Sequence, residues 1–351
     1  MDKKLILAVA GSGKTSLIVS KLNLEERFLL ITYTNNNTKN LKRSIIKKFG
    51  HFPNNIELLS YYNFLYSFCL RPFLAYKIKP RGIFWEQTPK YANRFKLDDI
   101  RRYMTKGRML FHNRIAKLLE QCGILNDINN RLTKYYDHLF IDEVQDLAGH
   151  DFNLLINILK SDINFLLVGD FYQHTFDTSR DGRTNSTLHN DFVKYQERFT
   201  KQKIEIDKEH LNKSYRCTKS VCEFITKNLG INIESHKDEE SVVSFINDKN
   251  EIMEIFEDDS IVKLFYRENY KYKCYSRNWG DCKGENHYNN VCVVLNKAAM
   301  DKYEKGKLNE LKPISKNKLY VACSRAKNNL YLIDESEIKH LKNKHRVQQC
   351  V

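Results

Sequence analysis

The chain has 351 residues, of which 42% are hydrophobic and 29% charged, and its formal net charge at pH 7 is +15. This length allows two domains of ordinary size, each with its own hydrophobic core. No apolar stretch reaches the roughly 18 residues of a membrane-spanning helix, and the run Leu5–Ala10 is shorter than the apolar core of a signal peptide. The nine cysteines are scattered and odd in number, which fits a reducing compartment better than a disulfide framework. We therefore expect a cytoplasmic protein and exclude an exported or membrane-spanning one.

A glycine-rich loop near the start of the chain is its most informative motif. The apolar run Leu5–Val9 predicts a strand, and residues Thr15–Lys21 predict a helix. Residues 8–15 at this junction read Ala-Val-Ala-Gly-Ser-Gly-Lys-Thr, a P-loop in which alanine replaces the first glycine. In a P-loop, backbone N–H groups surround the phosphates, the lysine reaches the β- and γ-phosphates, and the next hydroxyl holds Mg²⁺. The motif thus predicts a nucleoside triphosphate site formed by Ala10, Gly11, Ser12, Gly13, Lys14, Thr15 and Ser16, with Thr15 on the metal.

Short apolar runs alternate with helical patterns along the rest of the chain. The further runs are Phe28–Thr32, His138–Ile141, Phe165–Val168, Val291–Leu295 and Leu330–Ile333. Continuous runs of this length predict parallel strands that are buried on both faces. Helical apolar spacing occurs between them at Asn37–Phe49, Asp151–Leu159 and Thr218–Asn228. The alternation predicts an α/β fold with parallel sheets.

The positive charge is concentrated in one segment that is also rich in aromatic residues. Between Arg71 and Lys117 there are thirteen lysines and arginines but only three acidic residues, and eight aromatic side chains are interleaved with them. Cations mixed with aromatic rings suit a polyanion whose bases can stack, which favours nucleic acid. Arg101 and Arg102 are our candidates for contacts with it. A solvated basic face over a small aromatic core is the alternative interpretation.

These patterns divide the chain into two α/β units and an insert. The first unit consists of residues 1–71 and 133–205, and the basic, mainly helical insert of residues 72–132 interrupts it. The second unit consists of residues 206–351. Its acidic stretch Glu234–Asp259 is expected to lie on a surface away from nucleic acid.

Polar and acidic residues follow two of the predicted strands. Asp142 and Glu143 come directly after one apolar run, and the sequence Gly-Asp-Phe-Tyr-Gln, which ends at Gln173, follows the next. Open parallel sheets bind their ligands at the carboxyl ends of the strands. We therefore expect Asp142 to hold Mg²⁺, Glu143 to polarise the attacking water and Gln173 to sense the γ-phosphate.

Together with the P-loop, these motifs resemble those of the UvrD/Rep/PcrA-type superfamily 1 DNA helicases, and they occur in the family's order. The matching segments are residues 8–15, Thr32-Tyr33-Thr34-Asn35, Asp142-Glu143-Val144-Gln145-Asp146, Gly169-Asp170-x-x-Gln173 with Phe176 after it, Asn212-x-x-Tyr215-Arg216, Lys283-Gly284-Glu285, and Tyr320-Val321-Ala322-Cys323-Ser324-Arg325-Ala326-Lys327. The resemblance implies two RecA-like P-loop NTPase domains that hold ATP and Mg²⁺ between them.

The resemblance also implies roles for individual residues. Lys14, Glu143 and Gln173 would act on the triphosphate from the first domain, and Arg216 and Arg325 would stabilise the transferring phosphate from the second. The other nucleotide contacts implied in the second domain are Gly284 and Glu285. The residues implied in DNA contact are Tyr33, Thr34, Asn35 and Phe176, with Tyr33 and Phe176 as stacking platforms.

The implied activity is that of an Mg²⁺-dependent, DNA-stimulated ATPase that translocates on DNA, 3′ to 5′ by family analogy, with unwinding as a further capacity. Only 66 residues separate Arg216 from Lys283, so we expect a compact motor without the family's large second accessory domain. Two alternatives stay open: an ATPase switch that senses nucleotide and nucleic acid and acts through a partner protein, and RNA in place of DNA. A zinc site is a further alternative, although its spacings match no common zinc module, at Cys274, Cys282, His287 and Cys292.

Overall fold

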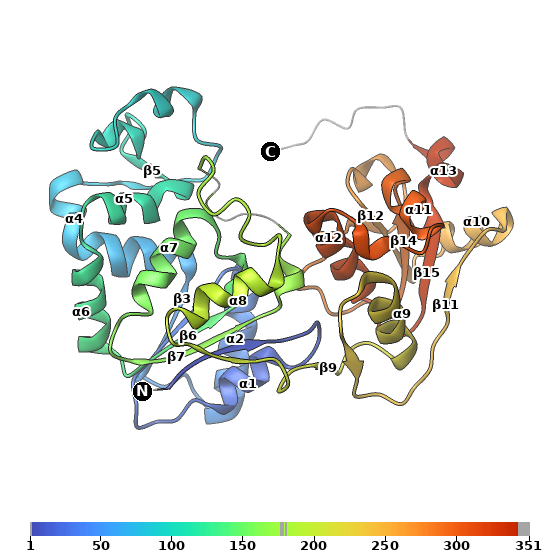
Figure 1. Cartoon of the computed structure of the whole chain (residues 1–351), viewed down its shortest axis with the longest axis horizontal. Coiled ribbons are helices and arrows are strands. Elements are labelled where there is room, and N and C mark those ends of the chain that lie inside the picture. The colour runs from blue at the N-terminus through green and yellow to red at the C-terminus, as the bar shows by residue number, and fades with distance from the viewer. Residues whose placement is uncertain (1, 176–178, 180, 343–351) are drawn as a thin grey trace. The chain divides into compact units, whose positions relative to one another are not determined.

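The computed structural model describes residues 2–175, 179 and 181–342. The chain divides into two compact units (Figure 1). Unit 1 comprises Met1–Leu7, Lys14–Gly169 and Phe176–Lys208, and unit 2 comprises Ala8–Gly13, Asp170–Thr175 and Glu209–Val351. Two short segments that follow strands of unit 1 in the sequence, Ala8–Gly13 and Asp170–Thr175, thus belong to unit 2.

Unit 1 contains a sheet of six parallel strands in the order β3-β2-β6-β7-β1-β8. Its strands are β1 (Lys3–Leu7), β2 (Phe28–Thr32), β3 (Ile56–Ser60), β6 (His138–Asp142), β7 (Asn164–Gly169) and β8 (Glu205–Asp207). All five residues of β2 are buried, as the continuous apolar run predicts for a central parallel strand. The first strand begins two residues earlier than predicted, because the Lys3 ammonium donates to the carbonyls of Leu159 and Ser161 and so tolerates a place in the sheet.

Helices of unit 1 follow the strands in the alternation that the sequence predicts. They include α1 (Lys14–Ser20), α2 (Asn35–Phe49), α7 (Gly149–Ile158) and α8 (Phe192–Thr200). Helix α2 begins where the Thr34 hydroxyl accepts a hydrogen bond from the Asn37 N–H at 3.2 Å, which is a helix cap worth about 1 kcal/mol. The helix ends at Phe49 and is capped by Gly50, whose φ of 80° suits the left-handed conformation of a C-terminal cap.

The insert lies between β3 and β6 in the sequence and is mainly helical. Its elements, preceded by α3 (Tyr61–Asn63) and the π-helical turn η1 (Phe64–Leu70), are α4 (Arg71–Ile78), β4 (Gly82–Phe84), β5 (Met109–Phe111), α5 (Ile115–Gln121) and α6 (Leu125–Tyr135). The short strands β4 and β5 pair in parallel. A buried ion pair connects the insert to the chain after β7: the guanidinium of Arg114 is 2.8 Å from the carboxylate of Asp181, which Lys117 also contacts at 2.8 Å.

Unit 2 contains a second parallel sheet of five strands in the order β11-β15-β14-β12-β13. The strands are β11 (Val243–Phe245), β12 (Ile261–Phe265), β13 (Ser276–Asn278), β14 (Asn290–Leu295) and β15 (Leu330–Asp334), and a separate parallel pair is formed by β9 (Lys213–Ser214) and β10 (Glu234–Ser235). The helices are α9 (Lys219–Leu229), α10 (Lys249–Glu257), α11 (Lys297–Tyr303), α12 (Pro313–Cys323) and α13 (Glu335–Ile338).

Both faces of this second sheet are buried in hydrophobic cores. Along β14, Val291 and Val293 join one cluster of buried side chains, whereas Cys292 and Val294 join another. Side chains alternate between the faces of a strand, so the two clusters cover opposite faces of the sheet. The predicted α/β fold with two parallel sheets is thereby confirmed. Among the described residues, no helix combines the length and the apolar character needed to span a membrane.

Candidate functional site

The glycine loop has the backbone conformation that a phosphate-binding turn requires. Gly11 and Gly13 have φ angles of +73° and +89°, which favour glycine over any residue with a side chain. A Cβ atom on Gly11 would also lie 2.7 Å from Cβ of Arg216 and 2.8 Å from the Ser214 hydroxyl oxygen. The Ser12 hydroxyl donates to the carbonyl of Val9 at 2.8 Å. Successive N–H groups in such a turn form an anion-binding nest.

Lys14 begins α1 and lies beside an acidic residue that follows β6. Its ammonium is 3.7 Å from a carboxylate oxygen of Glu143, and both side chains are 11% exposed. Glu143 has a φ of +58°, which is strained for a residue with a side chain, and its carboxylate accepts a hydrogen bond from the Gln145 amide. Asp142, at the carboxyl end of β6, is 6% exposed and accepts the Glu143 N–H at 3.0 Å. Unit 1 therefore brings together the lysine and the acidic residue that the sequence predicts.

Thr15 and Ser16 follow Lys14 in the first turn of α1. The predicted metal set of Thr15 and Asp142 offers a hydroxyl and a carboxylate oxygen, the hard donors that Mg²⁺ prefers, and the elements that carry them are in contact. The described residues contain no group of three or more histidine, cysteine or acidic side chains that could hold a metal ion by themselves. This donor set fits an ion that takes its other ligands from water and phosphate, as Mg²⁺ does in nucleotide sites.

A buried tyrosine connects three of the predicted motifs inside unit 2. The Tyr320 hydroxyl donates to the carboxylate of Asp170 at 2.9 Å and accepts the N–H of Ala10, also at 2.9 Å. Next to it, the Asn317 amide donates to the carbonyl of His174 at 3.0 Å. Gln173, the predicted phosphate sensor, lies in this segment and is 4% exposed. These contacts explain why the segment after β7 groups with the second unit, and they identify Tyr320 as a residue that the sequence analysis did not single out.

The two predicted arginines lie close together in unit 2. Arg216 donates to the carbonyl of Ser324 at 3.1 Å and to the side chain of Asn286. Arg325, which is 2% exposed, donates to the carbonyl of Glu285 at 3.0 Å. Burial, together with the nearby charge of Arg325, lowers the pKa of Arg216 to about 10. Within the described part of the chain, neither guanidinium has an acidic side chain within ion-pair distance, so this paired positive charge suits an anion.

The neighbouring predicted residues Gly284 and Glu285 have different surroundings. Gly284 is exposed and has a positive φ of 85°. The carboxylate of Glu285 accepts a hydrogen bond from the Tyr288 hydroxyl and lies 3.5 Å from the guanidinium of Arg277. Its carbonyl, as described above, accepts from Arg325. Contact of these two residues with a nucleotide stays a prediction.

The predicted nucleic-acid residues before and in α2 differ in exposure. Asn35 is exposed, whereas Thr34 uses its hydroxyl to cap the helix. Tyr33 is half-buried, and its hydroxyl oxygen lies 3.2 Å from that of Tyr62, a residue that the sequence analysis missed. Phe176, the other predicted stacking residue, lies outside the described residues.

The two arginines predicted to contact nucleic acid have partners within the insert. Arg102 is half-buried and donates to the carbonyls of Asn93 and Phe95, so its guanidinium satisfies the backbone of a turn. Arg101 is paired with the carboxylate of Asp99 at 2.6 Å. Neither contact could be inferred from a count of charges. Arg102 therefore has a structural role that the prediction did not include, and the nucleic-acid role of both arginines stays a prediction.

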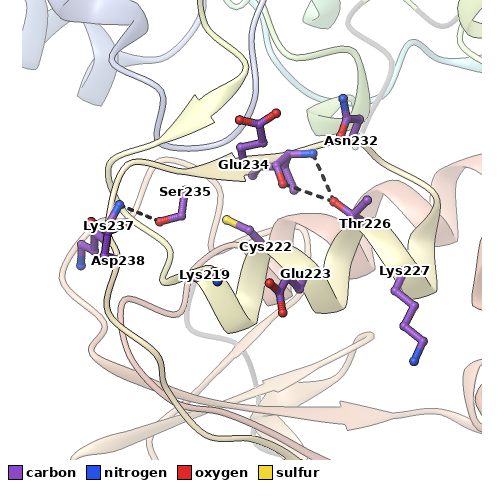
Figure 2. Close-up of a pocket in the computed structure, with 11 residues that line it drawn as sticks. Lys219, Cys222, Glu223, Thr226, Lys227, Asn232, Glu234, Ser235, Lys237 and Asp238 are labelled. Atoms are coloured by element: carbon purple, nitrogen blue, oxygen red, sulfur yellow. Dashed lines mark hydrogen bonds between the residues drawn. The ribbon is translucent and has the colours of Figure 1, made fainter.

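A separate pocket of about 550 Å³ lies along α9 in unit 2 (Figure 2). Cys222 points toward Ser235 across it, and Thr226 is hydrogen-bonded to the backbone of Ile233. Its charged lining is balanced, with Lys219, Lys227 and Lys237 against Glu223, Glu234 and Asp238. This mixture indicates no class of ligand. The alternative zinc residues are not gathered either, because Cys282 and Cys292 belong to hydrophobic clusters on opposite faces of the sheet.

Matches to known protein families cover most of the chain, from residue 2 to residue 334. A family model described as an AAA domain matches residues 2–177. A second model, described as the viral superfamily 1 RNA helicase core domain, matches residues 110–334. No curated protein matches the sequence.

Among solved structures, the complex of Arterivirus nonstructural protein 10 (helicase) with DNA is 13% identical, with a TM-score of 0.51 over 97% of this chain and 63% of that one. A crystal structure of the same Arterivirus protein is 14% identical, with a TM-score of 0.47 and coverage of 97% and 62%. The chain therefore spans about three-fifths of the length of these helicases. At such low identity the first of these likenesses shows a common fold, and the two family models together cover both units. The chain belongs to the superfamily 1 helicases, in the family of the viral superfamily 1 RNA helicase core domain.

Proposed function

We propose that this protein hydrolyses ATP in response to single-stranded nucleic acid and uses the energy to translocate along the strand. DNA is the substrate that the UvrD/Rep/PcrA-type resemblance favours, and 3′ to 5′ is the direction that it favours. The observation that carries the proposal is the pair of neighbouring arginines in unit 2, the half-buried Arg216 and the buried Arg325. Two adjacent guanidinium groups without a carboxylate partner in the described structure are costly to keep unless an anion uses them.

The chemistry of unit 1 supports hydrolysis. A γ-phosphate would compete with Glu143 for the ammonium of Lys14, which is only 3.7 Å from the carboxylate. Once released from Lys14, the Glu143 carboxylate can accept a hydrogen bond from the attacking water and orient it. Bound Mg²⁺ would neutralise developing charge on the phosphate oxygens, with Thr15 and Asp142 as its protein ligands.

The chemistry of unit 2 supports a response to the γ-phosphate. Arginines supplied to a transferring phosphoryl group raise hydrolysis by roughly 10³–10⁵-fold. Arg216 and Arg325 would lose their anion when the phosphate leaves, so the affinity of unit 2 for the nucleotide would fall after each turnover. The Tyr320 hydroxyl contacts both the P-loop segment and Asp170, and these two contacts support a role of Tyr320 in transmitting this change.

Steady-state hydrolysis and directional translocation test the proposal. ATP turnover should rise on addition of single-stranded oligonucleotide, and hydrolysis should release streptavidin from a 5′-biotin but not from a 3′-biotin. Stimulated hydrolysis without release at either end would contradict translocation and favour the sensing switch. The same assays with DNA and with RNA decide which strand is the substrate. Assays with each of the four nucleoside triphosphates decide which nucleotide is hydrolysed. Cytoplasmic location stays a prediction from the cysteines.

A further inference from the structure

A cluster of aromatic side chains connects the insert of unit 1 to the predicted nucleic-acid motif. Tyr33 of that motif lies 5.9 Å, ring centre to ring centre, from Tyr62. Tyr62 contacts Trp85 edge to face at 4.7 Å, and Trp85 lies nearly parallel to His112 at 6.1 Å. These four residues, Tyr33, Tyr62, Trp85 and His112, form what we call the aromatic ladder.

The insert positions the outer end of this ladder through its short parallel strands. In the pairing of β4 with β5, Phe84 is opposite Phe111, so the next residues, Trp85 and His112, emerge side by side at the same strand ends. The Nδ1 atom of His112 lies 3.2 Å from the carbonyl oxygen of Phe84, which holds the imidazole against the strand end. Backbone pairing thus fixes the outer end of the ladder, as a preformed binding surface requires.

Exposure of the ladder increases toward Trp85. Tyr33 and Tyr62 are half-buried, whereas the Trp85 side chain is 60% exposed. An indole has the largest apolar surface of any side chain. An exposed indole whose position is fixed by neighbouring side chains is typical of a binding surface. The indole is packed edge-on against Tyr62, so part of its surface remains open to solvent.

The charge of the insert indicates what covers this surface. Between Arg71 and Lys117 the sequence has thirteen basic and three acidic residues. In the described structure, several of these cations are exposed and have no acidic side chain within ion-pair distance: Lys79, Arg81, Lys90, Arg94, Lys96 and Lys106. Open aromatic rings among unpaired cations match a strand of nucleic acid, which offers stacking bases and phosphates at once.

We propose that Trp85 is a stacking platform for an unpaired base of the single strand, supported from behind by Tyr62 and His112. This inference rests on the proposed function and adds to it a binding residue outside the helicase motifs described above. Stacking of a base on an aromatic side chain is worth about 1–3 kcal/mol, so loss of Trp85 should weaken binding of the strand by about tenfold.

Intrinsic fluorescence provides a direct test, because the chain has two tryptophans and the other, Trp279, is 0% exposed in the core of unit 2. Titration of the full chain with oligodeoxythymidylate should quench the emission of exposed indole. Trp85→Phe should abolish this quenching and keep most of the affinity, whereas Trp85→Ala should abolish the quenching and also weaken binding by about tenfold. Tyr76→Ala, at an aromatic residue of the same insert that is 90% exposed, is the matched control and should bind as the wild type does.

An oligonucleotide with abasic sites separates stacking from charge. The wild type should bind the abasic strand more weakly than the normal one, and Trp85→Ala should reduce this preference by about tenfold, because the indole no longer contributes stacking. If Trp85→Ala binds both strands as the wild type does and the wild type shows no quenching, the platform is refuted. In that case strand-stimulated hydrolysis would still support the proposed function, whereas a wild type that neither binds nor responds to the strand would refute the proposed function itself.

Discussion

At the scale of single residues, the catalytic proposal depends on one long ion pair. The ammonium of Lys14 is 3.7 Å from Glu143, too far for a strong hydrogen bond, and each side chain is almost buried. A pair of this kind can be broken by a better partner without leaving a charge unsatisfied. The triphosphate would be that partner for Lys14, and the attacking water would be the new partner for Glu143.

Replacement of Glu143 by glutamine tests this exchange. Glu143→Gln keeps the size of the side chain but removes the negative charge that orients water, so we expect turnover to fall by about 10²–10⁴-fold. Nucleotide affinity should persist or increase, because Lys14 no longer has a competing carboxylate. Single-turnover hydrolysis and equilibrium nucleotide binding measure the two effects. Turnover near that of the wild type would remove Glu143 from the catalytic role.

At the scale of secondary structure, the insert depends on a buried ionic cluster. Arg114 is 2% exposed and donates to Asp181, to the carbonyl of Arg102 and to the side chain of Asn93. Burial by itself would raise the pKa of Asp181, but Lys117 and Arg114 outweigh it and lower the pKa below its ordinary value. The cluster therefore ties the insert to the rest of unit 1 while the carboxylate is ionised.

Replacement of Asp181 by asparagine should loosen the insert. An uncompensated buried charge costs about 3–5 kcal/mol, and the remaining partners of Arg114 favour the lower end of this range. Hydrogen exchange in β5 and α5 should accelerate in Asp181→Asn. As a control, Glu234→Gln, at the exposed pair with Lys213, should leave exchange in the insert unchanged. Unaltered protection in Asp181→Asn would show that apolar packing alone holds the insert.

The same cluster predicts a dependence on pH. Because the pKa of Asp181 is lowered in the folded chain, its stabilisation is fully present above the ordinary carboxyl pKa of about 4 and is lost as the pH falls through the lowered value. The insert of the wild type should therefore lose protection in acid, whereas that of Asp181→Asn should lose less. Equal acid sensitivity of the two proteins would contradict this assignment.

Strands that are uniformly apolar could be predicted from the sequence, but strands with a charge inside could not. The runs at Phe28–Thr32 and Leu330–Ile333 correspond to β2 and β15 within one residue. Strand β12 was missed because Lys263 interrupts its run, although the side chain is fully buried. Its ammonium donates to the carbonyls of Asp258 and Ile261. These hydrogen bonds satisfy the buried charge, and no apolar pattern in the sequence reveals them.

Parts of the candidate site could be predicted for a similar reason. Lys14 and Glu143 each follow a strand of the same parallel sheet, so their proximity could be expected from the edge that the carboxyl ends of these strands share. The link from Tyr320 to Ala10 joins residues 310 positions apart and depends on tertiary packing. The place of Trp85 beside His112 depends on pairing of two three-residue strands, which are too short to give a periodic signal.

At the scale of the whole molecule, two α/β units, each with a parallel sheet, carry complementary halves of the proposed chemistry. Unit 1 holds Lys14, Glu143 and the aromatic ladder, and unit 2 holds Arg216 and Arg325. A motor requires that the terminal phosphate of the nucleotide change the affinity of the protein for the strand. This coupling between nucleotide and strand is the central claim of our account.

The affinity for a single strand in two nucleotide states tests this claim most directly. We predict that the dissociation constant of a fluorescent oligonucleotide differs by about 5–150-fold between ADP and a non-hydrolysable ATP analogue, the range of typical coupling energies. Lys14→Ala and Arg325→Ala should bind the strand equally well in both states. Equal affinities of the wild type in the two states, with both nucleotides shown to be bound, would contradict the account.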